Sequence, residues 1–275
     1  MTSVRKATWF VLATFVFTWL LQAPGIVAMR SGEVPSAGLM LLMGLGSAGP
    51  SLVALGFNWA ERRFGWGEMR PKTKPRISWK LALFALFFPM GTHLLGSGVL
   101  RMLGLYDAQH WLYPPLLGTE IAIAIVAPLG EEFGWRGYAL PRLQTRWSPL
   151  RASLIIGLVW ALWHIPTLFV PGARGVTPFE LSLYLVAQVA SSVVYTWLYN
   201  VSGGSIVGPL LAHLGIHLDN VFRASAMGDG VMPLASTTAV LVVLATGLVW
   251  RGHLTPLAPS SSASSQLEPQ KGPVS

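Results

Sequence analysis

The sequence contains no cysteine and few charged residues. Asp, Glu, Lys and Arg make up 11% of the 275 residues, whereas soluble domains carry about 25%. The lack of cysteine excludes disulfide bonds, a thiolate metal site and a cysteine nucleophile. The chain is instead rich in hydrophobic residues, at 52%, and has 12 tryptophans. This composition predicts an all-α polytopic membrane protein.

Uncharged or weakly charged runs long enough to cross a bilayer occur eight times along the chain. We expect about eight transmembrane helices, at 7–29, 35–60, 81–100, 117–139, 152–170, 181–199, 206–222 and 234–250. The first run exceeds the usual length of a cleaved signal peptide's apolar part, so we interpret it as a retained helix. We divide the chain into an N-terminal three-helix region (1–116), a membrane core (117–223), a final transmembrane helix (224–253) and a disordered tail (254–275).

The basic residues predict the orientation of these helices. With the N-terminus inside, fifteen Lys and Arg residues fall on the inner side and four on the outer side. The loop 61–80 alone holds seven of them. Because positive residues accumulate on the cytoplasmic side, both termini are predicted to be cytoplasmic in a multi-pass protein of the cell membrane. The net charge of +8 is therefore a topology signal, and we expect no nucleic-acid partner.

One glycine-rich stretch resembles a nucleotide-binding pattern. Gly44-Leu-Gly46-Ser-Ala-Gly49 fits G-x-G-x-x-G, but no strand precedes it and it lies within a membrane-length run. Small residues that let two helices approach closely explain it better.

The charged stretch at the end of the fourth run is the main candidate for chemistry. It reads Gly130-Glu-Glu-Phe-Gly-Trp-Arg-Gly137. On a helix, Glu132 and Arg136 share one face and can pair, whereas Glu131 points about 100° away. Each charge near the middle of a bilayer costs roughly 3 kcal/mol, so such residues are normally functional and face an interior cavity.

Histidines in two later runs lie at a similar depth. His164 ends the stretch Trp160-Ala-Leu-Trp-His, and His213 and His217 are four residues apart on one helical face. Counted from the inner helix ends, Glu131, His164 and His213 lie at roughly 12, 18 and 11 Å. The sequence therefore predicts that they converge below the cytoplasmic surface. The lone His93 is assigned no role.

These motifs resemble those of the CPBP family of intramembrane endopeptidases, which includes CAAX prenyl proteases, abortive-infection proteins and bacteriocin-immunity proteins. The resemblance covers roughly 128–220. It rests on Glu131-Glu132-x-x-x-Arg136, on Trp160-x-x-x-His164, and on Ser205 leading through Pro209 to His213, with Pro50 also familiar. In this family the first glutamate acts on water, and the histidines assist catalysis or bind metal.

The resemblance implies roles for six residues: Glu131, Glu132, Arg136, His164, His213 and His217. Glu131 would activate water while Arg136 keeps Glu132 ionised. The family usually has Phe where this chain has Trp160, and Asn where it has His217. His213 and His217 form a pair suited to Zn²⁺, with His164 and Glu131 as further ligands. The alternative is a metal-free site in which His217 donates a hydrogen bond.

We therefore expect an intramembrane endopeptidase that hydrolyses membrane-associated or lipidated substrates, CAAX-type prenylated chains among them. Its partners would be the lipid bilayer and that substrate. Two other interpretations stay open. One is a proton-coupled transporter that uses Glu and His as a relay. The other is a catalytically silent immunity or scaffold protein.

Overall fold

The computed structural model describes residues 2–63, 77–105, 119–169, 177–226 and 231–256. Within these ranges the secondary structure is helical and contains no β-strand. The fold class predicted from composition is therefore confirmed. The elements are α1 (Ser3–Arg30), α2 (Ala37–Ser47), α3 (Gly49–Arg63), α4 (Trp79–Met102), α5 (Thr119–Gly134), the π-helix η1 (Trp135–Ala139), α6 (Leu140–Leu143), α7 (Pro149–Trp163), the 3-10 helix η2 (Ile165–Phe169), α8 (Pro178–Val201), α9 (Val207–Ala226) and α10 (Val231–Trp250).

Each of the eight predicted segments contains a helix, but they differ in length and hydropathy. Four helices among the described residues are long and apolar enough to cross a bilayer alone, namely α1, α4, α8 and α10. The pair α2 and α3 passes the same test only when taken together. The 16 residues of α5 and the 15 of α7 are short for a span, and α9 carries polar residues in its middle. The count of eight spans stays a prediction.

The second segment differs from the single helix expected over 35–60. It is bent by 61° between α2 and α3, and Pro50 lies at the start of the second helix. Proline has no N–H to continue the hydrogen bonds of the preceding helix, and its ring clashes with the preceding turn, so the helix bends there. The small residues of the G-x-G-x-x-G stretch meet α1 here, where Thr18 donates a hydrogen bond to the Gly46 carbonyl over 2.8 Å. Close helix packing, as predicted, accounts for this stretch.

Two further segments depart from regular α-helix beside the charged motif. The segment expected over 117–139 changes from α5 to the π-helix η1 at Trp135. The segment expected over 152–170 ends as α-helix at Trp163, where His164 is the C-cap and Pro166 follows. A π-bulge and a helix end both redirect side chains, and π-bulges are frequent at functional sites. Both irregularities therefore lie where the sequence predicts chemistry.

A buried ion-pair cluster anchors η1 and α6 to the first helices. Glu61, predicted to begin a loop, is instead the buried end of α3. Its carboxylate accepts hydrogen bonds from the Tyr138 hydroxyl over 2.7 Å and from Arg142 Nη2 over 2.9 Å. Lys6 of α1 lies 3.7 Å from the same carboxylate. These contacts join α1, α3, η1 and α6, and so position the helix that carries Arg136.

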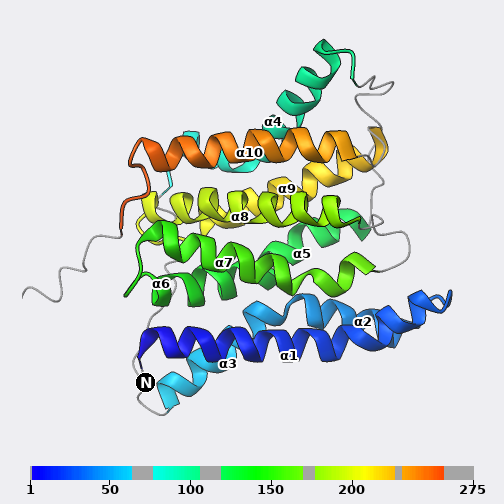
Figure 1. Cartoon of the computed structure of the whole chain (residues 1–275). Coiled ribbons are helices and arrows are strands. Elements are labelled where there is room, and N and C mark those ends of the chain that lie inside the picture. Colours follow the sequence, from blue (N-terminus) through cyan, green and yellow to red (C-terminus); the bar gives the residue numbers. More distant parts are fainter. Residues whose placement is uncertain (1, 64–76, 106–118, 170–176, 227–230, 257–275) are drawn as a thin grey trace, which may run out of the picture.

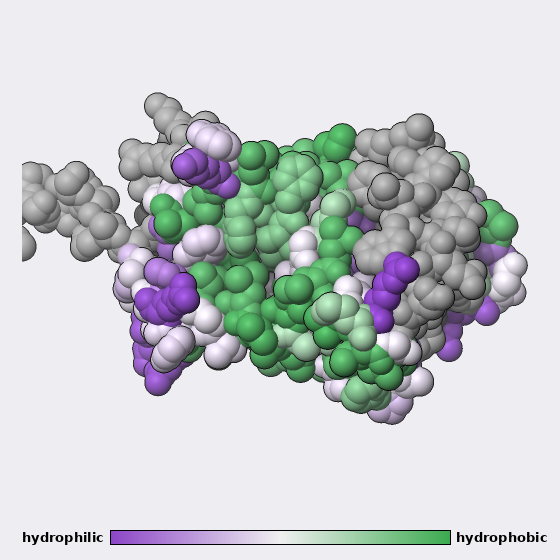
Figure 2. Space-filling view, turned by 90° about the horizontal axis from the view of Figure 1, so that it is seen from above, coloured by the Kyte–Doolittle hydropathy of each residue, from purple (hydrophilic) through white to green (hydrophobic). Residues whose placement is uncertain are grey.

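The bundle has the surface expected of a membrane protein. Figure 2 shows a broad hydrophobic band with hydrophilic residues gathered toward the ends. Large apolar side chains project from this band, among them Leu20, Leu41, Leu55 and Val243, each more than 60% exposed. Such exposure is costly in water and favourable in lipid. The chain is therefore a multi-pass membrane protein.

The first and last helices place their termini together. In Figure 1 the N-terminal end of α1 and the C-terminal end of α10 lie at the same end of the bundle. These two helix ends lie on one side of the bundle (Figure 1), and the cytoplasmic placement of both chain termini stays a prediction. The predicted domain boundary at 116 and most of the predicted tail lie outside the described residues.

Candidate active site

The two adjacent glutamates of α5 point in different directions, as the helical period requires. Glu132 Oε1 accepts a hydrogen bond from Arg136 Nη1 over 2.9 Å, and both side chains are fully buried. The guanidinium carbon of Arg136 also lies 4.6 Å from the ring centres of Trp160 and Tyr195. A cation between two aromatic faces is attracted by both rings. The predicted pairing of Glu132 with Arg136 is therefore present in the structure.

His213 of α9 lies between the two glutamates. Its Nδ1 atom lies 2.9 Å from Glu132 Oε1, and its Nε2 atom lies 4.0 Å from Glu131 Oε1. A carboxylate only accepts hydrogen bonds, so Nδ1 of His213 carries a proton, and Nε2 is directed toward Glu131. Glu132 therefore fixes both the orientation and the tautomer of His213.

Trp160 of α7 binds the glutamate that Arg136 leaves free. Its indole N–H donates a hydrogen bond of 2.6 Å to Glu131 Oε2. In the sequence, Trp160 stands out only as a replacement for the family's usual Phe, and this contact is not predicted. The signal that could have revealed this contact is the replacement of the family's usual Phe by an aromatic residue with an N–H donor. Glu131 is 4% exposed, so the charge-assisted bond is shielded from water.

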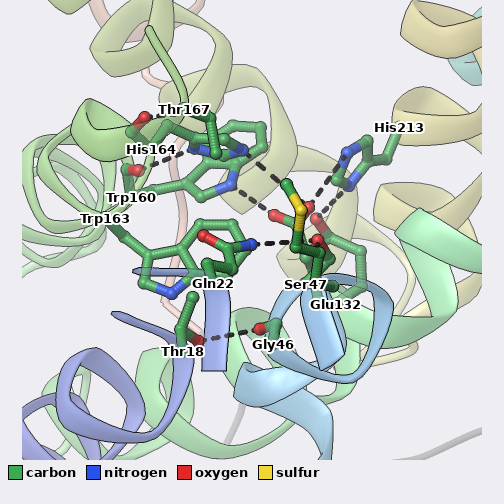
Figure 3. Close-up of polar contacts among 12 residues, drawn as sticks. Thr18, Gln22, Gly46, Ser47, Glu132, Trp160, Trp163, His164, Thr167 and His213 are labelled. Carbon is green, nitrogen blue, oxygen red and sulfur yellow. Dashed lines mark hydrogen bonds and ion pairs between the residues drawn. The ribbon is translucent and has the colours of Figure 1, made fainter. Parts of the chain in front are cut away.

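His164 completes the group from the end of α7. Its Nδ1 atom lies 2.9 Å from the Trp160 carbonyl oxygen, which fixes the proton on Nδ1. Its Nε2 atom lies 3.9 Å from Glu131 Oε1. The predicted convergence of Glu131, His164 and His213 is therefore present. Figure 3 shows His164 and His213 beside Trp160 and Glu132. Glu131 Oε1 faces the Nε2 atoms of both imidazoles, each at a distance that one water molecule can bridge with bonds of about 2.8 Å.

His217 lies one turn further along α9. Its ring stacks on that of His213, with centres 5.1 Å apart and planes inclined by 15°. It also lines the cavity in front of Glu131. Among the described residues, His217 forms no hydrogen bond or ion pair with either glutamate of the motif.

A zinc ion requires ligands of suitable chemistry and suitable spacing. Two imidazoles with Nδ1 held by a carbonyl or carboxylate match the chemistry of metal-bound histidines. The distances from Glu131 Oε1 to the two Nε2 atoms, 3.9 and 4.0 Å, do not match, because two ligands of a tetrahedral zinc with bonds of about 2.05 Å lie about 3.4 Å apart. No three His, Asp or Glu side chains in the described part of the chain are close enough together to hold a metal ion. As arranged here these residues do not fit zinc, and zinc binding stays a prediction.

A cavity of about 580 Å³ opens in front of Glu131. Its walls come from α1, α2, α5, α7, η2 and α9, and are mostly apolar, with Met40, Met43 and Val126 among them. Glu131, His164 and His217 form the polar end. A mostly apolar cavity with a few converging polar groups is the usual form of a ligand site. The cavity can therefore hold an apolar ligand with a reactive group next to Glu131.

The remaining sequence-based assignments lie away from this group. His93 of α4 lies 3.9 Å from Asp219 of α9, measured from Nδ1 to Oδ2. This buried pair was not foreseen, and it joins the helix that carries both later histidines to α4. The side chains of Glu120 and Asn220 lie outside the described residues.

Comparisons with known proteins match the same part of the chain. Residues 114–218 match the family model described as type II CAAX prenyl endopeptidase Rce1-like. Over 132 residues, the chain is 28% identical to a CAAX prenyl protease 2 of Methanococcus maripaludis. The aligned region covers 46% of this chain and 47% of that protein. The chain thus spans about half the length of this curated relative. Residues 114–218 also hold all six predicted site residues, so the part of the chain that is similar to CAAX prenyl endopeptidases is the part that carries the candidate site.

Proposed function

We propose that this protein is an intramembrane endopeptidase that hydrolyses peptide bonds of membrane-associated substrates. The observation that carries the proposal is the free oxygen Oε1 of Glu131. It lies 3.9 Å from His164 Nε2 and 4.0 Å from His213 Nε2, at the polar end of the apolar cavity. A water molecule between these atoms would have a base and an orienting acceptor beside it.

The proposed reaction begins when Glu131 Oε1 takes a proton from this water. The hydroxide oxygen then forms a bond to the carbonyl carbon of the substrate, and a tetrahedral oxyanion results. Glu131 returns the proton to the leaving amine as the C–N bond breaks. His213, held by Glu132 through Nδ1, orients the water at the start. The same carboxyl thus acts first as base and then as acid, and no proton is lost or gained.

We further propose a prenylated CAAX-type peptide as the substrate. Supporting observations are the likeness to a CAAX prenyl protease 2 and the apolar walls of the cavity. A volume of about 580 Å³ is within the range of about 300–1,000 Å³ that is typical of ligand sites. The apolar walls would hold the lipid chain while the peptide lies beside Glu131.

The test is a cleavage assay with purified protein in detergent or nanodiscs. A fluorogenic peptide ending in a prenylated CAAX sequence is compared with the same peptide without the prenyl group. We expect cleavage of the first at a rate at least tenfold higher, and no cleavage of either by the Glu131→Gln variant. Absence of any cleavage, with proton-coupled uptake in liposomes, would instead support the transporter interpretation.

A further inference from the structure

We propose that the protein binds an anionic phospholipid in a second site, which shares no lining residue with the cavity in front of Glu131. The site is a surface hollow of about 520 Å³ between the N-terminal end of α1 and the loop that follows α6. We call it the α1–α6 hollow and define it by Arg5, Trp9, Leu12, Arg146 and Trp147. Figure 1 shows α6 and the start of α1 at the same end of the bundle.

The positive charge of the α1–α6 hollow favours the binding of an anion. Arg5 and Arg146 are both exposed and line the same hollow. Neither side chain has an ion-pair or hydrogen-bond partner among the described residues. Nearby Lys6 and Arg142 differ, because both are buried and lie 3.7 and 2.9 Å from the Glu61 carboxylate. Within the described ranges, no acidic side chain therefore neutralises the positive charge of the two arginines of the hollow.

Two tryptophans in the hollow indicate its depth in the membrane. Trp9 is 50% exposed, and Trp147 is half-buried next to Arg146. Tryptophan prefers the boundary between headgroups and acyl chains, where its ring is in contact with lipid and its N–H with polar groups. Arginines beside tryptophans at this level lie where lipid phosphates are found.

An apolar stripe continues from the hollow along α1. Leu12, Val16 and Leu20 are 50%, 59% and 70% exposed. With Arg5 and Trp9 they follow spacings of four, three, four and four residues, so all five lie on one helical face. The helix rises about 16.5 Å over the eleven steps from Trp9 to Leu20, which is close to half of a hydrocarbon core of about 30 Å. One acyl chain can therefore lie along this stripe while its phosphate contacts the arginines.

The order of groups on this face is that of a lipid molecule. A positive site is followed by an aromatic boundary and then by an apolar stripe one leaflet long. Free phosphate would use only the first of these parts, which is why we assign the site to a lipid. Because Arg5 belongs to α1 and Arg146 follows α6, a bound phosphate would bridge the two segments. We expect lipid binding to raise the thermal stability of the protein.

The experiment measures the lipids that the full chain retains. Purified protein is incubated with equal amounts of phosphatidylglycerol and phosphatidylcholine of identical acyl chains, and bound lipid is counted by native mass spectrometry. We expect at least tenfold preference for phosphatidylglycerol. The double variant Arg5→Gln/Arg146→Gln should lose this preference, with retention lower by about tenfold. Arg5→Lys/Arg146→Lys, which keeps both charges, should retain most of the preference.

The matched control is Arg151→Gln/Arg251→Gln. It removes two exposed charges outside the α1–α6 hollow, so retention should stay unchanged. Equal losses in the two double variants would show attraction by overall charge and overturn the site. Equal retention of the two lipids would overturn recognition of an anion. Competition by glycerophosphate or inorganic phosphate at concentrations equal to those of the lipid would overturn the role of the acyl chain. Thermal melts identify any variant that does not fold. If the Gln double variant does not fold, the lipid preference of the Lys double variant is compared with that of the parent protein instead.

Discussion

The indole N–H of Trp160 donates a hydrogen bond of 2.6 Å to Oε2 of Glu131, and this contact distinguishes the two oxygens of the carboxylate. Oε2 is held by α7, while Oε1 faces His164 and His213 at 3.9 and 4.0 Å. A base is most effective when its reactive atom is fixed near the proton that it removes. Trp160 therefore positions the residue that we propose as the base.

Glu131→Gln should abolish peptide cleavage without unfolding the protein. The amide keeps the size of the side chain and loses the basic oxygen, so we expect a decrease in kcat of about 10²–10⁴. The measurement is cleavage of the prenylated peptide beside a thermal melt in detergent. Glu33→Gln, at an exposed position, is the matched control. An active Glu131→Gln variant would remove Glu131 from the proposed role.

Trp160→Phe should preserve packing and lose the hydrogen bond to Glu131. Hydrogen bonds to charged groups contribute about 1.5–3 kcal/mol, so kcat should fall by about 10- to 100-fold with little change in KM. Steady-state kinetics on the same peptide measure this split. The control is Trp197→Phe, a partly buried tryptophan that packs on Phe84. If Trp160→Phe cleaves at the full rate, the indole serves packing alone.

Arg136→Ala should destabilise the protein more than any substitution of Glu131. It leaves the fully buried Glu132 without its cationic partner, and loss of one member of a buried pair costs about 3–5 kcal/mol. Thermal melting and gel filtration in detergent report the loss. Glu132→Gln/Arg136→Gln removes both charges and should recover part of the stability. Equal stability of Arg136→Ala and the parent protein would contradict this account.

Removal of divalent metal should leave the cleavage rate unchanged. The distances of 3.9 and 4.0 Å from Glu131 Oε1 to the two imidazoles suit a bridging water better than a shared zinc ion. The test combines elemental analysis with cleavage after chelation and after return of Zn²⁺. About one metal per chain, with activity lost on chelation and restored by Zn²⁺, would support the zinc site predicted from His213 and His217.

The predicted topology can be tested with reporter fusions. A reporter after Leu116 should lie outside, and one after Thr145 should lie inside, if residues 117–139 cross the membrane. The reason is the distribution of basic residues, fifteen on the predicted inner side against four on the outer side. Alkaline phosphatase and green fluorescent protein fusions give opposite signals on the two sides. Both reporters on one side would mean that the segment with the glutamate motif does not span.

Relations within one helix could be predicted from the sequence. The pairing of Glu132 with Arg136 follows from the helical period, because residues four apart share a face whatever surrounds them. Composition and the lengths of apolar runs determine the all-α membrane class in the same way. The similar depths of Glu131, His164 and His213 also followed from counting residues along three helices.

The tertiary structure alone decided how these helices turn toward one another. Helix rotation depends on side-chain packing between segments far apart in the chain, such as Gly134 of α5 against the Pro50 carbonyl of α3. That packing sets which oxygen of Glu131 meets Trp160 and places His213 against Glu132. The sequence therefore determined which polar groups enter the membrane, and interhelical packing determined the atoms that face one another there.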